Sequence, residues 1–276
     1  MSSASHEVAT RYRNWLLRVL PPQEQELLAP HLEPVPLELG RVVAEFNVPI
    51  EHVYFPEDGI ISSLSVMADG SGVETATIGL EGMSGIAVFH GVDATPEHVF
   101  VQVPGNGHRV ASHIFRAILS DAPRLTAVLH RYSVALLTLI GQTSGCNRKH
   151  SVLRRCARWL LMTHDRVGRD GFELTHHILS QVLGVRRASV TEAALALSEA
   201  GAIAYRRGFV TVLDRRALER QACECYGVIN STFDRLLGEG ETPNPLDGMA
   251  LSKDGRTIAK DGTPMADPGE GPNALS

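Results

Sequence analysis

The sequence predicts an α+β fold in which an antiparallel β jelly roll is followed by a long helix and a winged helix-turn-helix. Short alternating strands separated by turn residues occupy residues 34–103. Apolar residues then recur at helical spacing over 124–143, and two short helices around a glycine precede two short strands over 174–213. The expected domains are a jelly roll at 1–121, a helix and hinge at 122–147, a winged domain at 148–238 and a disordered tail at 239–276.

Length and composition indicate a folded protein. The chain has 276 residues, of which 43% are hydrophobic, enough for one large or two ordinary cores. No apolar run approaches the length of a membrane span, and the first six residues lack the layout of a signal peptide. We therefore expect a cytoplasmic protein without membrane contact.

Four cysteines are too few for a disulfide framework and include no Cys-x-x-Cys pair. They are Cys146, Cys156, Cys223 and Cys225. Cys223 and Cys225 could bind metal or sense oxidants, but the expectation for a cytoplasmic chain is reduced thiols on a C-terminal helix. The sequence thus predicts no metal ligands and no cofactor.

The N-terminal part alternates helices with strands. An amphipathic helix is expected over 7–20, where Pro21 and Pro22 stop it, and a second over 23–32. Alternation and turn residues then predict six strands, at 35–39, 41–46, 52–55, 60–67, 73–78 and 98–103. Strands this short and evenly spaced favour an antiparallel barrel or jelly roll.

A helix is expected over 111–121, and a longer one from Arg124. In the longer helix, apolar residues alternate at steps of four and three, as in a coiled coil. They are Leu125, Leu129, Tyr132, Leu136, Leu139 and Thr143. The expected partners of this face are the chain's own barrel and the same helix of a second subunit, the alternative being a core helix of a monomer. The small residues of 142–146 predict a hinge.

A basic helix at 150–167 leads to the helix-turn-helix. Ile178, Leu179, Val182 and Leu183 repeat at helical spacing and meet Gly184, which can adopt a left-handed turn without strain. A second helix follows, with an apolar face formed by Val190, Ala193, Ala194 and Leu197. In this motif the second helix lies in the DNA major groove.

The flanking residues strengthen this interpretation. Strands at 202–205 and 209–213 surround Arg206, Arg207 and Gly208, which gives a basic wing. Thr175 can cap the first helix, whereas the second begins beside two arginines without a capping side chain, which suits a phosphate. Residues 148–216 hold thirteen Lys and Arg against six Asp and Glu, although the whole chain is −5. This split indicates one nucleic-acid face on an acidic molecule.

This order of parts resembles the Crp/Fnr superfamily of bacterial transcription regulators. The segments that carry the resemblance are 80–88 in the barrel, 159–167 and 174–194. The resemblance implies a homodimer in which the barrel senses a signal, the long helix relays it, and the winged domains bind a palindromic operator in double-stranded DNA near a promoter, with RNA polymerase as a further partner.

The ligand pocket that the resemblance implies is degenerate. Members that bind cyclic AMP hold the ribose with a Gly-Glu pair and the phosphate with an Arg-Ser or Arg-Thr pair. Those positions here are Ser84, Gly85, Glu97 and His98. Because a glutamate repels a phosphodiester, we expect no cyclic-AMP binding. The first cysteine is Cys146, so the N-terminal cysteines of iron–sulfur members are also missing.

The resemblance also assigns residues to DNA. The base-reading positions are Arg187, Ala188, Thr191 and Glu192. The phosphate candidates are Thr175, His176, Arg186, Ser189, Arg206 and Arg207. The family's usual glutamate and arginine are absent at Ala188 and Glu192, so the expected half-site differs from the TGTGA and TTGAT types.

Three other interpretations stay open at this point. An enzyme is not expected, because no nucleophile elbow, P-loop, dinucleotide-binding glycine set or zinc-protease motif occurs and no catalytic residue can be named. A haem, metal or redox sensor of the same fold would use barrel histidines, of which the candidates are His90, His98, His108 and His113. A winged module that binds protein is the third. The effector, the operator sequence and the sign of regulation are not predicted.

Overall fold

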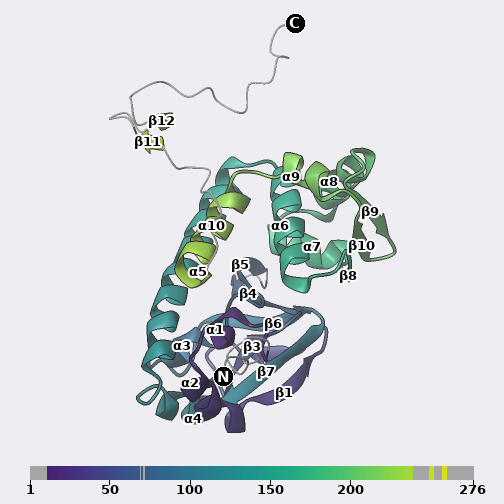
Figure 1. The fold of residues 1–276 in the computed structure, drawn as a ribbon. Coiled ribbons are helices and arrows are strands. Elements are labelled where there is room, and N and C mark those ends of the chain that lie inside the picture. The colour runs from purple at the N-terminus through teal and green to yellow at the C-terminus, as the bar shows by residue number, and fades with distance from the viewer. Residues whose placement is uncertain (1–10, 69, 71, 239–248, 252–256, 260–276) are drawn as a thin grey trace, which may run out of the picture.

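The protein is a two-lobed molecule whose lobes are joined along one side by a long helix (Figure 1). The computed structural model describes residues 11–68, 70, 72–238, 249–251 and 257–259. Within these ranges, no helix is both long and apolar enough to cross a bilayer. The mixture of helices and antiparallel sheets confirms the predicted fold class.

The N-terminal helices are shorter than expected. They are α1 (Trp15–Arg18) and α2 (Pro22–Leu28), followed by a 3₁₀ turn (Ala29–His31). Asn14 begins α1, because its side chain accepts from the amides of Leu16 and Leu17. The same side chain donates to the carbonyls of Pro56 and Gly82, which anchors the entry of the chain to the barrel. Residues 7–10 of the expected helix lie outside the described ranges.

The barrel consists of two antiparallel sheets around one core. Their orders are β1-β7-β3 and β2-β6-β4-β5. The strands are β1 (Glu33–Leu37), β2 (Val42–Ala44), β3 (His52–Pro56), β4 (Ile60–Val66), β5 (Gly72–Ile78), β6 (Glu97–Val103) and β7 (Gly105–Ala111). The six predicted strands are confirmed, with boundary shifts. The strand β7 was not expected, because its glycines resemble those of a turn. The strand requires glycine at position 107, because a Cβ there would lie 2.8 Å from the carbonyl oxygen of Phe55.

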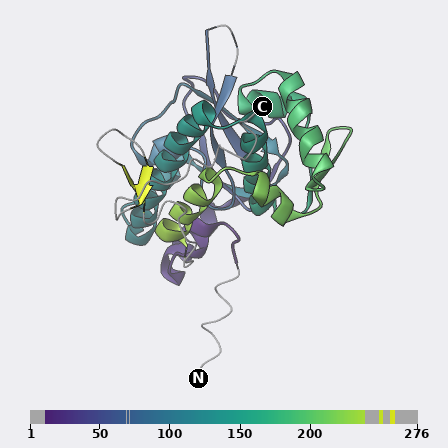
Figure 2. The same cartoon turned by 90° about the horizontal axis from the view of Figure 1, so that it is seen from above.

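The helix α3 (Ile86–Phe89) lies between β5 and β6, whereas α4 (Ser112–Ile118) and α5 (Pro123–Lys149) follow the strands. α5 is helical without interruption through 142–146, so the hinge expected there is wrong. The break comes at His150, and Ser151 caps the next helix by accepting from the amide of Arg154. Small residues alone did not break α5, since α10 (Cys225–Leu237) packs along it (Figures 1 and 2).

The face of α5 that was expected to form the dimer interface packs within its own chain. Leu125, Leu129, Tyr132 and Leu139 are buried, whereas Leu136 and Thr143 are half-buried. The Tyr132 hydroxyl donates to the Met83 carbonyl at 2.9 Å, and its ring lies 6.4 Å from that of Phe233 on α10. The four buried side chains therefore have no surface left for a partner. Barrel and α10 cover them, and the sequence could not place α10 there.

The core of the winged domain includes Trp159 and Leu160 and extends to Ile60 and Val103 of the barrel. Its elements are α6 (Val152–Val167), β8 (Gly171–Glu173), α7 (His176–Leu183), α8 (Arg187–Glu199), β9 (Ile203–Arg206), β10 (Phe209–Val212) and α9 (Arg215–Gln221). The wing is a three-stranded sheet of order β8-β10-β9, with β8 as an addition to the expected hairpin. α9 was likewise not predicted.

The C-terminal segment contains one described element, an antiparallel pair of β11 (Met249–Leu251) and β12 (Thr257–Ala259). The expectation of a disordered tail over 239–276 did not include this pair. The rest of that expectation, 239–248, 252–256 and 260–276, lies outside the described ranges.

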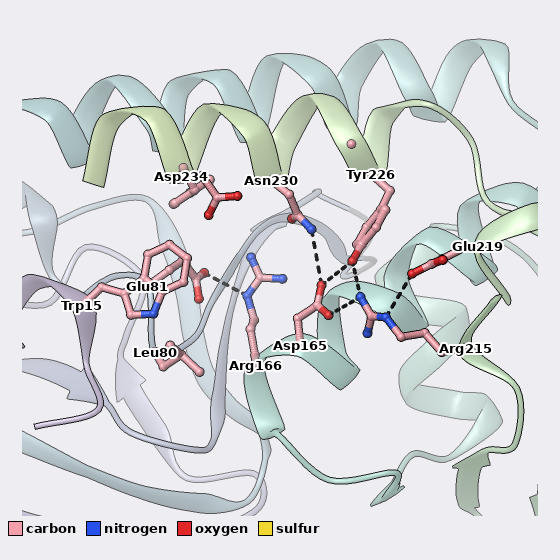
Figure 3. A pocket seen from close by; sticks show the side chains of 12 residues that line it. Trp15, Leu80, Glu81, Asp165, Arg166, Arg215, Glu219, Tyr226, Asn230 and Asp234 are labelled. Carbon is pink, nitrogen blue, oxygen red and sulfur yellow. Dashed lines mark hydrogen bonds and ion pairs between the residues drawn. The ribbon is translucent and has the colours of Figure 1, made fainter. Parts of the chain in front are cut away.

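The two lobes are joined by buried polar contacts. Arg166 on α6 forms an ion pair with Glu81 of the barrel at 2.8 Å, and their side chains are only 6% and 8% exposed (Figure 3). The Trp159 indole donates to the Glu74 carboxyl on β5 at 3.0 Å. Burial raises the pKa of Glu74. The hydrogen bonds from Ser62, Trp159 and Thr77 favour the charged carboxylate and offset part of this increase. The winged domain is therefore docked on the barrel of the same chain.

Replacing Glu81 with alanine should reduce the free energy of unfolding by about 3–5 kcal/mol, because the guanidinium of Arg166 would stay buried without its partner. Urea denaturation followed by circular dichroism measures this loss. The control is Glu33→Ala, which breaks the exposed pair with Arg109 and should change stability little. Equal losses of stability in the two variants would show that the Arg166–Glu81 pair contributes no more than an exposed ion pair.

Candidate nucleic-acid interface

The helix-turn-helix has the predicted local geometry. Thr175 begins α7 by accepting from the amide of Ile178 at 3.2 Å. Gly184 ends it with φ +60°, in the left-handed region that favours glycine. Leu179, Val182 and Leu183 face the core, while Ile178 is half-buried. Both the cap and the glycine turn are confirmed.

α8 is divided into a buried and an exposed face. Val190, Ala193, Ala194 and Leu197 are buried in the domain core. The four predicted base-reading residues are all exposed: Arg187, Ala188, Thr191 and Glu192. Their spacing of one, three and one residues places them together on one side at the amino-terminal end. A guanidinium there can donate to a guanine and a carboxylate can accept from a cytosine amine.

The amino terminus of α8 has no side-chain cap. Arg186 occupies the capping position and makes no capping hydrogen bond, as the sequence predicted. The first amides of a helix carry partial positive charge, and here they lie beside the exposed side chains of Arg186 and Arg187. Ser189, in the same first turn, is half-buried. This end of α8 is suited to a phosphate group.

His176 supports α8 from beneath. Its Nδ1 lies 3.1 Å from the Thr191 hydroxyl, and its ring lies 4.5 Å from the ring of Tyr205. Its Nε2 is buried and has no hydrogen-bond partner among the described residues. In this arrangement His176 does not present a nitrogen to a phosphate, contrary to the expectation. The Thr175 hydroxyl accepts the cap hydrogen bond of α7 and keeps its own proton for donation, so its contact with a phosphate stays a prediction.

The wing presents two arginines at a tight turn. Arg206 ends β9 and pairs with Phe209 of β10, so that Arg207 and Gly208 form a two-residue turn. Both have positive φ, +49° and +80°, as a type I′ hairpin requires. The Leu174 amide donates to the Gly208 carbonyl at 2.7 Å, which fixes the wing beside the start of α7. Arg206 and Arg207 are exposed.

Part of the positive charge counted in the sequence is internal. Arg155, Arg158 and Arg166 are buried. Arg155 donates to the Leu183 carbonyl, and Arg158 donates to the sulfur of Met162 at 3.2 Å. These three arginines hold the domain together rather than face a ligand. The arginines at the start of α8 and on the wing are exposed and are therefore available to an anionic ligand.

The degenerate pocket residues lie on different parts of the barrel. Ser84 is buried and pairs with Tyr54 through backbone hydrogen bonds of 2.9 and 3.2 Å. Gly85 has φ +87° and precedes α3. Glu97 and His98 begin β6 in the other sheet, opposite Ser65 and Leu64 of β4.

A cavity of about 450 Å³ lies between the lobes rather than among the pocket positions, lined by residues of α6, α9, α10 and the 80–81 segment (Figure 3). Its charged groups pair with one another. Arg215 lies 2.7 Å from Asp165 and 3.0 Å from Glu219, and the Tyr226 hydroxyl donates to Asp165 at 2.7 Å. Burial raises the pKa of Tyr226, so this hydroxyl keeps its proton. The cavity wall acts as a polar connection between the lobes.

The barrel histidines have separate neighbours. His90 contacts the Ser133 hydroxyl at 2.9 Å, His108 lies 3.4 Å from Glu57, and His98 stacks on Phe100 at 5.8 Å. In the part of the chain that the structure describes, none of the four, His113 included, belongs to a group of three or more potential metal ligands.

Comparison with known proteins assigns the fold. Residues 154–221 match the Crp-like helix-turn-helix domain family. A crp/fnr-family regulator from Eubacterium rectale superposes with a TM-score of 0.57 and 15% identity, over 73% of this chain and 94% of that one. FixK2 from Bradyrhizobium japonicum superposes with a TM-score of 0.56 and 15% identity, over 70% of this chain and 98% of FixK2. A CRP-family regulator from Thermus thermophilus superposes with a TM-score of 0.56 and 18% identity, over 68% of this chain and 96% of that one. A search of curated protein sequences finds no similar protein.

Replacing Arg187 with alanine should weaken binding to the preferred DNA by about 1–3 kcal/mol and relax the preference at one base pair, because the guanidinium reads a guanine. Fluorescence anisotropy with a set of single-base variants of the selected site measures both effects. Arg220→Ala removes an exposed arginine of α9 and serves as the control. If Arg187→Ala weakens all DNAs equally, Arg187 contacts only phosphate.

Proposed function

We propose that this chain, a transcription regulator of the Crp/Fnr type with a DNA-binding helix-turn-helix domain, acts as a homodimer on a palindromic operator and does so without cyclic AMP. The observation that carries the proposal is the exposed end of α8. There, an uncapped helix start, two arginines and the base-reading side chains share one surface, with the basic wing beside it. RNA polymerase is the further partner proposed from the family resemblance.

The homodimer is supported by the outer face of α5. Alternating steps of three and four residues connect six exposed positions, which are Ala127, His130, Val134, Leu137, Gly141 and Ser144. Val134 and Leu137 are 54% and 67% exposed, and a Cβ at Gly141 would meet no atom within 4 Å. A heptad stripe with exposed apolar residues at its centre and small residues around them is a surface that a second copy of the same helix can cover.

The two-fold symmetry of a palindromic operator also favours a second copy of this chain on the outer face of α5. A single recognition helix reads one half-site, and two helices one DNA turn apart require a two-fold axis. A second copy of α5 on this stripe supplies such an axis. The interface is therefore proposed on the stripe and not on the buried face with Leu125, Leu129, Tyr132, Leu136, Leu139 and Thr143.

Independence from cyclic AMP is proposed from the pocket positions. Glu97 stands where the family places a phosphate-binding arginine, and Thr75 is the side chain within hydrogen-bond distance of its carboxylate, at 3.5 Å. The carboxylate would repel the cyclic phosphate. Gly85 replaces the ribose-binding glutamate, and a side chain at this position would be strained at φ +87° and would lie 3.1 Å from Val53.

The wild-type protein should select discrete genomic fragments as a dimer, and its affinity should fall steeply with salt, because phosphate contacts release counterions. Leu137→Lys should yield monomers by light scattering and lose at least tenfold in affinity for the selected site. The control Val92→Lys changes a residue of similar exposure, 47%, away from α5 and should leave both unchanged. A wild-type monomer that ignores DNA at low salt would refute the proposal.

Titration calorimetry with cyclic AMP should show no binding in the micromolar range, and cyclic AMP should leave affinity for the selected DNA unchanged. The matched variant is Glu97→Arg, which restores a cation at the phosphate position. Micromolar binding by the wild type would contradict the proposed loss of this ligand.

A further inference from the structure

Four potential metal ligands from distant parts of the sequence meet at the carboxyl end of α5. Cys146 lies in the last turn of α5, and His150 directly follows that helix. Cys225 is the first residue of α10, and Cys223 lies just before it. One ligand atom from each lies within 4.8 Å of every other. The three cysteines are buried and form a small cluster of their own.

The spacing of these atoms is that of ligands around a shared centre. The sulfur atoms of Cys146 and Cys223 are 3.6 Å apart, and the Cys225 sulfur lies 3.5 Å from His150 Nδ1. A disulfide would require about 2.05 Å. In a tetrahedron with Zn–S bonds of about 2.3 Å and a Zn–N bond of about 2.0 Å, neighbouring ligand atoms are about 3.5–3.8 Å apart. These two distances agree with tetrahedral edges, and the other pairs of ligand atoms lie within 4.8 Å of one another.

The histidine is oriented as a ligand. Its Nε2 lies 3.1 Å from the Glu224 carboxylate, which leaves Nδ1 directed at the sulfur atoms. A carboxylate that fixes the outer nitrogen is the usual second partner of a zinc-bound histidine. The Gln142 amide donates to the Cys225 sulfur at 3.2 Å, which holds this sulfur in place beside the other ligand atoms.

The surroundings also suit the charge of the site. Three thiolates and Zn²⁺ leave one net negative charge in a buried position, which needs nearby cations. Arg155 and Arg158 are both buried on α6, the helix that follows His150 in the chain. Their placement offsets the residual charge.

We propose that Cys146, His150, Cys223 and Cys225 form a structural Zn²⁺ site. Soft sulfur ligands with one imidazole select Zn²⁺ over hard cations, and four protein ligands leave no open position for catalysis. The metal joins the end of α5 to the α9–α10 connection, at the point where the chain turns into α6. It therefore fixes α10 along α5 and sets the link between the long helix and the winged domain.

The test begins with the full-length wild-type protein, purified without added chelator. Elemental analysis should find about one zinc per chain, and X-ray absorption at the zinc edge should show three sulfur neighbours at about 2.3 Å and one nitrogen at about 2.0 Å. Neither measurement depends on DNA binding, so this proposal and the proposed function can fail separately.

Variants locate the site. Cys223→Ser should reduce the bound zinc at least tenfold. Cys156→Ser should retain it, because Cys156 lies outside the group and burial raises the pKa of its thiol to about 12. Glu224→Gln keeps all four ligands but should weaken zinc binding about 10- to 100-fold in competition with a chromophoric chelator. Glu224→Gln and the zinc-edge spectrum of the wild-type protein still test the proposed zinc site if Cys223→Ser does not fold.

Several results would overturn the proposal. One is a zinc-free wild-type protein that does not take up supplied Zn²⁺ under reducing conditions, and another is a Cys146–Cys223 disulfide found by mass spectrometry in place of a zinc site. The absorption of an iron–sulfur cluster would also overturn it, as would zinc that persists in Cys223→Ser and is bound with unchanged affinity by Glu224→Gln.

Discussion

The arrangement of the protein depends on the packing of α5 against its own chain. Tyr132 shows this constraint most directly, because its hydroxyl bonds to the barrel at Met83 and its ring meets Phe233 of α10. Burial raises the pKa of this tyrosine, so the hydroxyl remains a donor. With one face of α5 satisfied internally, the opposite face with Val134 and Leu137 is free for a second copy. One helix thus serves both the protomer core and the proposed assembly.

The winged domain uses its arginines in two ways that only the structure separates. Arg155 and Arg166 are buried and hold α6 to its surroundings, while Arg186 and Arg187 are exposed at the start of α8. A buried guanidinium must be paired, and Glu81 and the Leu183 carbonyl fill that role. The proposed DNA contacts and the docking on the barrel thus involve different arginines of one domain.

Features with local causes were predictable from the sequence. Gly184 and Thr175 mark the ends of α7 by backbone conformation and capping, and both act within a few residues of themselves. Features with distant causes were not. Residues 142–146 resemble a hinge until α10 is placed beside them, and β7 resembles a turn until β1 and β3 pair with it. The cysteines at 146 and 223 are far apart in the chain, so ligand spacing could not reveal their meeting.

The uninterrupted course of α5 has a mechanical consequence. A 27-residue helix is a rod of about 40 Å, and a rod transmits tilt without absorbing it. A rotation of about 5° at the barrel would displace its far end by about 3.5 Å, which is comparable to the spacing of successive base pairs. Because the helix ends at His150 and the next one starts after Ser151, a tilt of α5 would reach the winged domain at that point, in addition to the direct contacts of Arg166 and Trp159 with the barrel.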